Sequence, residues 1–308
     1  MKNWSREIGV AASIALLYAV LFFTGRGYFS AENFGDLFMA NVSVLIVSLG
    51  MLLIILTGQI DISVGSQFAV CSVVAGVAAK AGMPVALAGL AACAAGALFG
   101  AMGGGLVAFL RIPSIVVTLA MMIALRDGLR WLTQGAWIED LPAGFHWLSL
   151  TQSRFTATVA FLAVALVGAA TAGLRYLPAG RKVLASGSSE AAARILGIRT
   201  DRVVFSVFSL TGALTGLAAA LNAMRFHQVP SNAGLGMEMK VIAAVVVGGA
   251  AITGGSGTVI GTVLGVILLG SVGTALTFLG VSAYWEQAIQ GAIILAAVAI
   301  NVSGRRRE

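Results

Sequence analysis

Long apolar stretches alternate with short polar segments along the whole chain. A stretch of about 17–25 apolar residues is long enough to cross a bilayer as a helix. Ten such spans are predicted, at about 8–23, 37–56, 64–79, 84–110, 113–132, 155–174, 203–222, 239–253, 257–279 and 285–302. The third and eighth are short, so an eight-span arrangement is an alternative that also leaves both ends on one side.

The predicted fold class is therefore all-α, a polytopic membrane helical bundle with a single transmembrane domain over residues 1–308. Continuous apolar runs argue against an outer-membrane barrel, whose strands alternate apolar and polar residues. The first run begins at Ile8 and is not followed by a small-residue cleavage site, so we expect it to remain as the first span.

Composition excludes most other classes of protein. Hydrophobic residues make up 59% of the chain and charged residues 10%, whereas soluble domains have about 25% charged residues. Soluble enzymes, nucleic-acid binders and disordered proteins are thereby excluded. Cys71 and Cys93 lie inside apolar segments, and the chain has 2 histidines, so no metal site is predicted.

The distribution of charge predicts the orientation. With ten spans and a cytoplasmic N-terminus, 12 of the 19 Lys and Arg residues are cytoplasmic: Lys2, Arg6, Arg111, Arg175, Arg181, Lys182, Arg194, Arg199, Arg202, Arg305, Arg306 and Arg307. The acidic residues expected on the outer side are Glu32, Asp36, Glu139, Asp140, Glu238 and Glu286. Because cationic loops stay inside, both termini and the polar segment 175–202 are predicted to be cytoplasmic.

Small residues recur four positions apart, a spacing that lets two membrane helices lie directly on each other. The stripes are Gly96, Gly100 and Gly104; Gly257, Gly261 and Gly265; and the pair Gly212 and Gly216. We interpret them as helix-packing surfaces.

The segment Thr57-Gly58-Gln59-Ile60-Asp61-Ile62-Ser63-Val64-Gly65 separates the second and third spans. An acid near membrane depth is costly and is a candidate for function. Two interpretations stay open for Thr57, Gly58, Gln59, Asp61, Ser63 and Gly65: a part of the translocation pathway, or a structural turn in which Asp61 faces water or caps the third span. Ser63 is a possible helix cap.

The segment Gly187–Ile198 predicts a short helix within the polar loop. Ser188 or Ser189 suits its N-cap, and Gly197 suits its C-terminal end. A helix of about two turns is unstable alone in water, so it either docks in a partner's groove or rests on its own membrane domain. The residues expected to form this contact are Glu190, Ala191, Ala192, Ala193, Ile195, Leu196 and Gly197.

Three segments together resemble the permease subunits of bacterial ABC importers, in the ribose-type sugar group that includes autoinducer-2 permeases. Thr57–Gly65 resembles the family's T-G-G-I-D-L-S-V-G, with Gln59 in place of a glycine. Gly187–Ile198 resembles its cytoplasmic E-A-A-type coupling loop. The segment 241–257 resembles its A-A-V-V-L-G-G…G-G-x-G stretch.

This resemblance implies a transport subunit of the bacterial inner membrane that carries a monosaccharide or small polyol by alternating access and is not itself an enzyme. It implies a cytoplasmic ATP-binding subunit docked on Glu190–Gly197, a second permease subunit, identical or paralogous, and a periplasmic solute-binding protein. The chain contains no Gly-x-x-x-x-Gly-Lys-Ser/Thr sequence, so ATP and Mg²⁺ are expected on the partner and no cofactor on this chain.

Three alternatives are weighed against this interpretation. A branched-chain amino acid permease would differ only in its solute. An ion-coupled secondary transporter would need several interacting ionisable residues at the midplane, where the sequence offers Asp61 alone. An integral-membrane enzyme would need a cluster of His, Cys or carboxylates within the bundle, and both histidines lie in predicted outer loops.

Overall fold

The structure is a computed structural model that describes residues 4–24, 27–281, 285, 288–289 and 291–292. Its elements in chain order are α1 (Trp4–Thr24), α2 (Ala31–Leu56), α3 (Val64–Lys80), α4 (Val85–Ala108), α5 (Ser114–Thr133), the 3₁₀ turn η1 (His146–Ser149), α6 (Gln152–Tyr176), α7 (Pro178–Ser188), α8 (Glu190–Ile195), α9 (Thr200–Ala223), α10 (Met237–Val247) and α11 (Val259–Phe278). Within these residues the only β pairing is one isolated bridge between Ile138 and Val229. The all-α prediction is confirmed.

Five of the described helices are long and apolar enough to cross a membrane: α2, α4, α6, α9 and α11. Shorter apolar helices cover Glu7–Phe23, which is most of α1, and Val64–Lys80, which is all of α3. The predicted fifth span is a 20-residue helix, α5, that carries Arg126, Asp127 and Arg130. Most of the predicted tenth span, 285–302, lies outside the described residues.

The predicted eighth span, 239–253, is wrong in its extent. Helix α10 has 11 residues and ends at Val247. At 1.5 Å per residue it is about 16 Å long, roughly half the thickness of a bilayer core. The helix ends there because Gly249 adopts φ +96°, a left-handed conformation, and the following amide of Ala250 donates back to the Val245 carbonyl at 3.2 Å.

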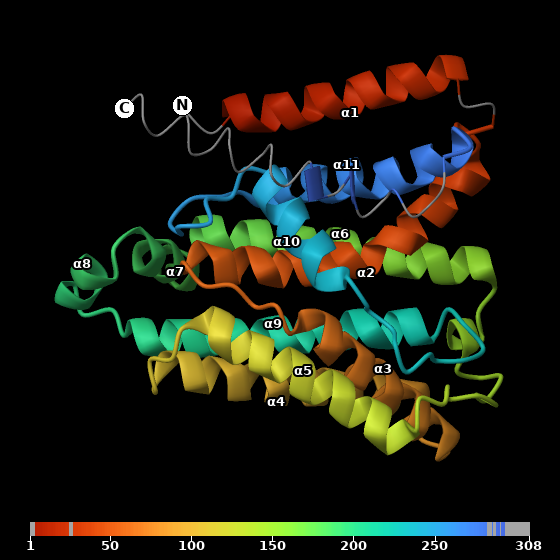
Figure 1. Cartoon of the computed structure of the whole chain (residues 1–308), viewed down its shortest axis with the longest axis horizontal. Helices are drawn as coiled ribbons and strands as arrows, with labels where there is room; N and C mark the ends of the chain where they lie inside the picture. Colours follow the sequence, from red (N-terminus) through yellow and green to blue (C-terminus); the bar gives the residue numbers. More distant parts are fainter. Residues whose placement is uncertain (1–3, 25–26, 282–284, 286–287, 290, 293–308) are drawn as a thin grey trace.

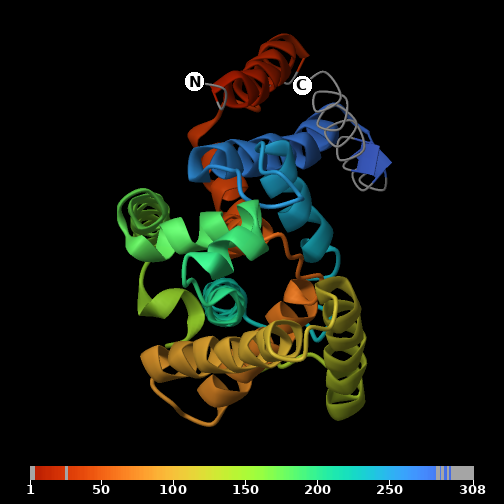
Figure 2. The same ribbon diagram turned by 90° about the vertical axis from the view of Figure 1, so that its left-hand side faces the viewer.

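The helices stack in layers from α1 at one edge to α4 at the other, with α2, α9, α10 and α11 between them (Figures 1 and 2). Helix α2 is central and contacts α9, α11, α10 and α6. Helix α1 packs on α11 at the edge of the bundle, where Leu21, Tyr28 and Ala275 form a small separate core. The main core is built on α2, so the other elements are positioned relative to it.

Glycines line the most extensive helix contact, between α4 and α9. A methyl group on Gly96 would lie 2.9 Å from the carbonyl carbon of Gly212 and 3.1 Å from the nitrogen of Gly216. Gly100 meets the backbone of Phe208, and Gly104 faces its side chain. The first stripe and the Gly212–Gly216 pair therefore face each other.

The second stripe divides between a helix and a loop. Gly261 and Gly265 lie on α11 against the backbone of Gly248 and Ala244, at the end of α10. Gly257 precedes α11 and packs on Ala250 instead. The prediction that Gly257 belongs to one helical stripe with Gly261 and Gly265 is wrong. Helix α11 begins only at Val259, with Thr258 as its N-cap.

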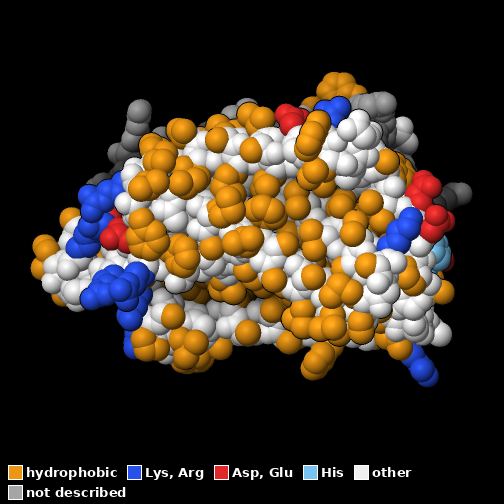
Figure 3. Space-filling model, turned by 90° about the horizontal axis from the view of Figure 1, so that it is seen from below, with side chains coloured by type: hydrophobic (Ala, Val, Ile, Leu, Met, Phe, Trp, Pro, Cys, Tyr) orange, Lys and Arg blue, Asp and Glu red, His pale blue; other side chains and the backbone are white. Residues whose placement is uncertain are grey.

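The two ends of the bundle differ in charge (Figure 3). The end with α7 and α8 gathers exposed cations, namely Arg111, Arg175, Arg181, Lys182, Arg199 and Arg202. The opposite end carries the exposed acids Glu32, Asp36, Glu139 and Asp140. This is the asymmetry that the positive-inside rule uses.

Candidate functional site

The short helix α8 forms where the sequence predicts it and is capped at both ends. The hydroxyl of Ser189 accepts a hydrogen bond from the Ala192 amide at 3.3 Å. Beyond the other end, Gly197 adopts φ +78°. The amides of Gly197 and Ile198 donate to the carbonyls of Arg194 and Ala193, each at 3.0 Å. This is the Schellman pattern of a helix stop, so local sequence alone defines α8.

Helix α8 presents two apolar side chains to the outside. Ile195 is 87% exposed and Leu196 78% exposed, and Ala191 and Ala192 are also exposed. Ala193, expected at the contact surface, is instead 2% exposed. Ala193 packs against the chain itself. The prediction that it contacts a partner is therefore wrong.

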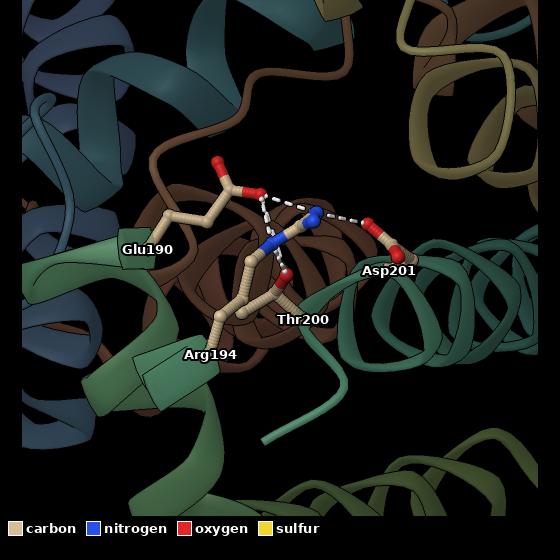
Figure 4. Close-up of polar contacts among 4 residues, drawn as sticks. All are labelled: Glu190, Arg194, Thr200 and Asp201. Carbon is tan, nitrogen blue, oxygen red and sulfur yellow. Dashed lines mark hydrogen bonds and ion pairs between the residues drawn. The ribbon is translucent and has the colours of Figure 1, made fainter. Parts of the chain in front are cut away.

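A polar network joins α8 to the start of α9 (Figure 4). Arg194 bridges Glu190, four residues earlier, with Nη2 2.8 Å from Glu190 Oε1. The same guanidinium reaches Thr200 Oγ1 at 3.0 Å and Asp201 Oδ1 at 2.5 Å. One cation thus fixes α8 relative to a long helix of the bundle.

Glycines connect α7, the helix before α8, to two other segments. Gly187 packs so closely on the carbonyl of Leu56, at the end of α2, that a methyl group there would overlap it. A methyl group on Gly254 would lie 2.9 Å from the Gly187 carbonyl and 2.8 Å from the Gly58 nitrogen. The Gly255 amide also donates to Leu56 at 3.0 Å. The three sequence segments that carry the family resemblance therefore meet at this glycine junction.

The turn around Asp61 is buried and fully partnered. Asp61 is 1% exposed. Its carboxylate accepts from the Ser63 amide at 2.8 Å, from the Ser63 hydroxyl at 2.6 Å and from Gln67 Nε2 at 3.2 Å. The turn is thus built internally around the start of α3, and Asp61 does not face water.

The other residues of this turn hold the two helix ends. Ser63 makes no side-chain cap for α3, contrary to the prediction, because its hydroxyl is engaged by Asp61 and Gln67. Thr57 donates its hydroxyl to the Ile54 carbonyl at 2.7 Å. Gly58, with φ +77°, reverses the chain after α2. Gln59 is half-buried, and its backbone amide donates to the Ile54 carbonyl at 3.2 Å.

Two charged residues that the sequence did not indicate as site residues, Glu238 and Arg126, lie beside the start of α3. Glu238, expected on the outer side, is 8% exposed and rests on Gly65, where a methyl group would overlap its carboxylate. Arg126 on α5 donates from Nε to Ser66 Oγ at 3.2 Å. Both residues precede or interrupt apolar runs, and only the packing of α5 and α10 against α3 brings them inward.

A cavity of about 690 Å³ opens at the end of α2 opposite to α8. Its lining combines acidic, basic and aromatic side chains, among them Glu32, Asp36, Trp147, Arg225 and Phe226. Behind it, His146 stacks on His227 with ring centres 3.8 Å apart, and His146 Nε2 lies 3.1 Å from the Arg225 carbonyl. Within the described residues no group of three or more potential metal ligands occurs.

Comparison with known proteins identifies the family. Residues 33–298 match the family described as "Branched-chain amino acid transport system / permease component". The chain is 36% identical over 303 residues to "Autoinducer 2 import system permease protein LsrC" of Yersinia pseudotuberculosis, which covers 98% of this chain and 86% of that protein. The same identity and coverages hold for the LsrC of Yersinia pestis. No solved structure matches.

Proposed function

The chain belongs to the permease-component family of branched-chain amino acid transport systems, and we propose that it is the membrane subunit of a bacterial ATP-driven importer for a small polyhydroxylated solute. Identity of 36% across nearly the whole chain to permeases named for autoinducer-2 import supports this class of solute. A permease subunit is a transport component, and ATP with Mg²⁺ is expected on the partner subunit.

The end of the bundle that bears α7 and α8 is the cytoplasmic end in this proposal. The concentration of exposed cations there supports that orientation (Figure 3). Both termini are then cytoplasmic, as ten crossings would require, and the protein resides in the inner membrane.

Cysteine labelling tests the orientation. The Leu196→Cys variant should react with a membrane-impermeant thiol reagent in inside-out vesicles, and Leu150→Cys in right-side-out vesicles. Cys71 is buried and gives a low background, while half-buried Cys93 is replaced by Ala in both variants. The reverse pattern of labelling would contradict the orientation.

The observation that carries the proposal is the exposed apolar pair Ile195 and Leu196 on a rigidly capped helix. Two large apolar side chains at a basic, water-facing end favour a partner that covers them. The expected partner is the ATP-binding subunit, with a groove that accepts α8. Because Arg194 and the glycine junction fix α7 and α8 to α9, α2 and the loop before α11, displacement of α8 would move the helix ends of the bundle together.

We expect the remaining partners at two other surfaces. The cavity near Glu32 and Asp36 lies at the opposite end and provides a polar, aromatic surface for a solute-binding protein. Helix α6 buries only Phe155, Val159 and Ala163, so most of its surface is left for lipid or for a second permease subunit.

Removal of the apolar pair tests the docking of α8. We expect the double variant Ile195→Ser, Leu196→Ser to insert normally, to co-purify with less ATP-binding subunit and to lose uptake in proteoliposomes. Ala192→Arg, which adds bulk and charge on the exposed face, should act in the same direction. Leu150→Ser, at the other end, is the matched control. Unchanged recovery of the ATP-binding subunit and unchanged uptake would refute the docking role.

The family description favours one second candidate, import of branched-chain amino acids. Uptake of labelled autoinducer-2 and of labelled leucine, each with a solute-binding protein for that solute, separates the two. Uptake of leucine alone would overturn the proposed solute class.

A further inference from the structure

Three polar side chains around the first turn of α3 each keep one buried atom without a hydrogen-bond partner among the described residues. The atoms are Gln67 Oε1, Arg126 Nη2 and Glu238 Oε2. Gln67 is 1% exposed and Glu238 8% exposed. They come from three helices, α3, α5 and α10, and their side chains contact Ser63, Ser66 and Gly65 around the first turn of α3.

Neighbouring contacts hold these side chains, although none of the contacts is a hydrogen bond to those three atoms. Gln67 uses its amide nitrogen for Ser63 at 2.8 Å and Asp61 at 3.2 Å. Arg126 uses Nε for Ser66 Oγ, which itself donates to the Met122 carbonyl at 2.9 Å. Glu238 Oε2 packs directly on Gly65, where a methyl group would overlap it.

The group lies within the bundle, away from its two ends. Helices α3 and α10 both begin part-way along the long helix α2 (Figure 1), and they contact each other. Secondary transporters place solute sites near the midplane where discontinuous helices begin, because such helix starts expose polar backbone inside the membrane. The same physical argument applies to the half-length α10 of this chain.

Two of these three unpartnered atoms belong to charged side chains, which distinguishes the group from the unpartnered hydroxyls of Tyr28, Ser48 and Ser72. A buried polar atom without a partner destabilises a fold by about 1–3 kcal/mol, and more if it is charged. Charged side chains inside membrane proteins generally mark solute or ion pathways. Asp61, a few residues away, shows that this chain can satisfy a buried acid completely.

We propose that Gln67, Arg126 and Glu238 form a binding station for the transported solute within the translocation pathway. Hydroxyl groups of a polyhydroxylated solute would donate to Glu238 Oε2 and Gln67 Oε1, and a hydroxyl oxygen would accept from Arg126 Nη2. This inference rests on the proposed function. An amino acid would offer an ammonium group to Glu238 and a carboxylate to Arg126, so leucine is the competing solute in the test.

The test uses the complete importer in proteoliposomes, with autoinducer-2 as the probe and the solute-binding protein at saturation. Glu238→Gln and Arg126→Lys are compared with the parent for uptake and for ATP hydrolysis stimulated by the binding protein. We expect uptake to fall about tenfold in each variant, because a charge-assisted hydrogen bond is lost, while stimulated ATP hydrolysis stays within twofold of the parent. Ser48→Ala, which removes a buried and equally unpartnered hydroxyl on α2, is the matched control and should change neither.

Each other outcome has a distinct meaning. Unchanged uptake in both variants of an active parent would overturn the binding station and leave the proposed function intact. A parallel loss of folded complex, ATP hydrolysis and uptake in both variants would assign the group to folding and would also overturn it. A parent that imports leucine but not autoinducer-2 would overturn the proposed solute class, and the polyol station with it.

Discussion

The end of α8 and the first turn of α3 both break the rule that apolar side chains are buried and polar side chains exposed, but in opposite ways. The end of α8 exposes two large apolar side chains, Ile195 and Leu196, in a charged environment. The α3 turn buries Glu238 and Gln67 with unpartnered polar atoms inside an apolar bundle. Local departures of this kind are expected at functional sites, since a sequence optimised only for folding would avoid both. We expect the exposed apolar pair on α8 to bind a protein partner and the buried polar group at the start of α3 to bind a polar ligand.

Asp61 is a buried acid that, unlike Glu238, has hydrogen-bond partners for its carboxylate within the described part of the chain. From the sequence it was the most prominent acid near membrane depth, yet three hydrogen bonds satisfy it within the turn. Burial of a charged group is therefore insufficient evidence for a pathway, and the hydrogen-bond partners of the charged group must be considered as well.

The largest expected effect comes from disrupting the glycine contact between α4 and α9, because both α8 and α3 pack on α9. Gly96→Leu would force a side chain into the backbone of Gly212, and we expect a cost of about 3 kcal/mol, the upper end of the usual range for overpacking. Folded yield in detergent should fall severely, with loss of both uptake and ATP hydrolysis. Gly105→Leu, on the same helix with no atom within 4 Å of the added position, is the control. Equal yields of the two variants would show that α4 and α9 do not depend on this contact.

A smaller effect is expected from Asp61→Asn, which separates a structural acid from a pathway acid. The asparagine side chain keeps only one acceptor oxygen, so it cannot accept from both Ser63 and Gln67, and stability should fall by about 1–3 kcal/mol. Thermal unfolding should shift to lower temperature, whereas uptake per folded transporter should stay within twofold. Lost uptake at unchanged thermal stability would place Asp61 in the pathway beside Glu238.

The attachment of α8 is tested by Arg194→Ala. This variant removes the contacts with Glu190, Thr200 and Asp201, and for a partly exposed network we expect about 1 kcal/mol of local stability to be lost. Amide hydrogen exchange should accelerate in α8 but not in α9, and uptake should fall severalfold. Arg202→Ala removes a nearby exposed cation and none of these contacts, so it should behave as the parent. Unchanged exchange in Arg194→Ala would show that the caps alone hold α8.

The smallest effect is expected at the end of α8. Gly197→Ala places a side chain at φ +78° with open space around it, so the cost is backbone strain of about 1 kcal/mol. Exchange of the Ile198 amide, which donates to Ala193, should accelerate modestly. Gly197→Asn should be closer to the parent because asparagine tolerates this conformation. An equal effect of both substitutions would argue against strain as the cause.

The sequence by itself determined the helical class, most helix positions and the existence of α8. Apolar runs of sufficient length are written in consecutive residues, and α8 is defined by Ser189 and Gly197 a few positions apart. The same local logic failed for α10, because the glycines that end it are surrounded by apolar residues that resemble a full span.

Only the tertiary structure decided which residues meet. Gly187 reaches Leu56 and Gly254, and Arg126 and Glu238 converge on the start of α3 from helices far apart in the chain. Neither set has a fixed spacing, and Glu238 precedes an apolar run as an ordinary loop residue would. Its burial depends on where a half-length helix begins relative to its neighbours. Three-dimensional packing fixes that depth, and the local pattern of residues does not encode it.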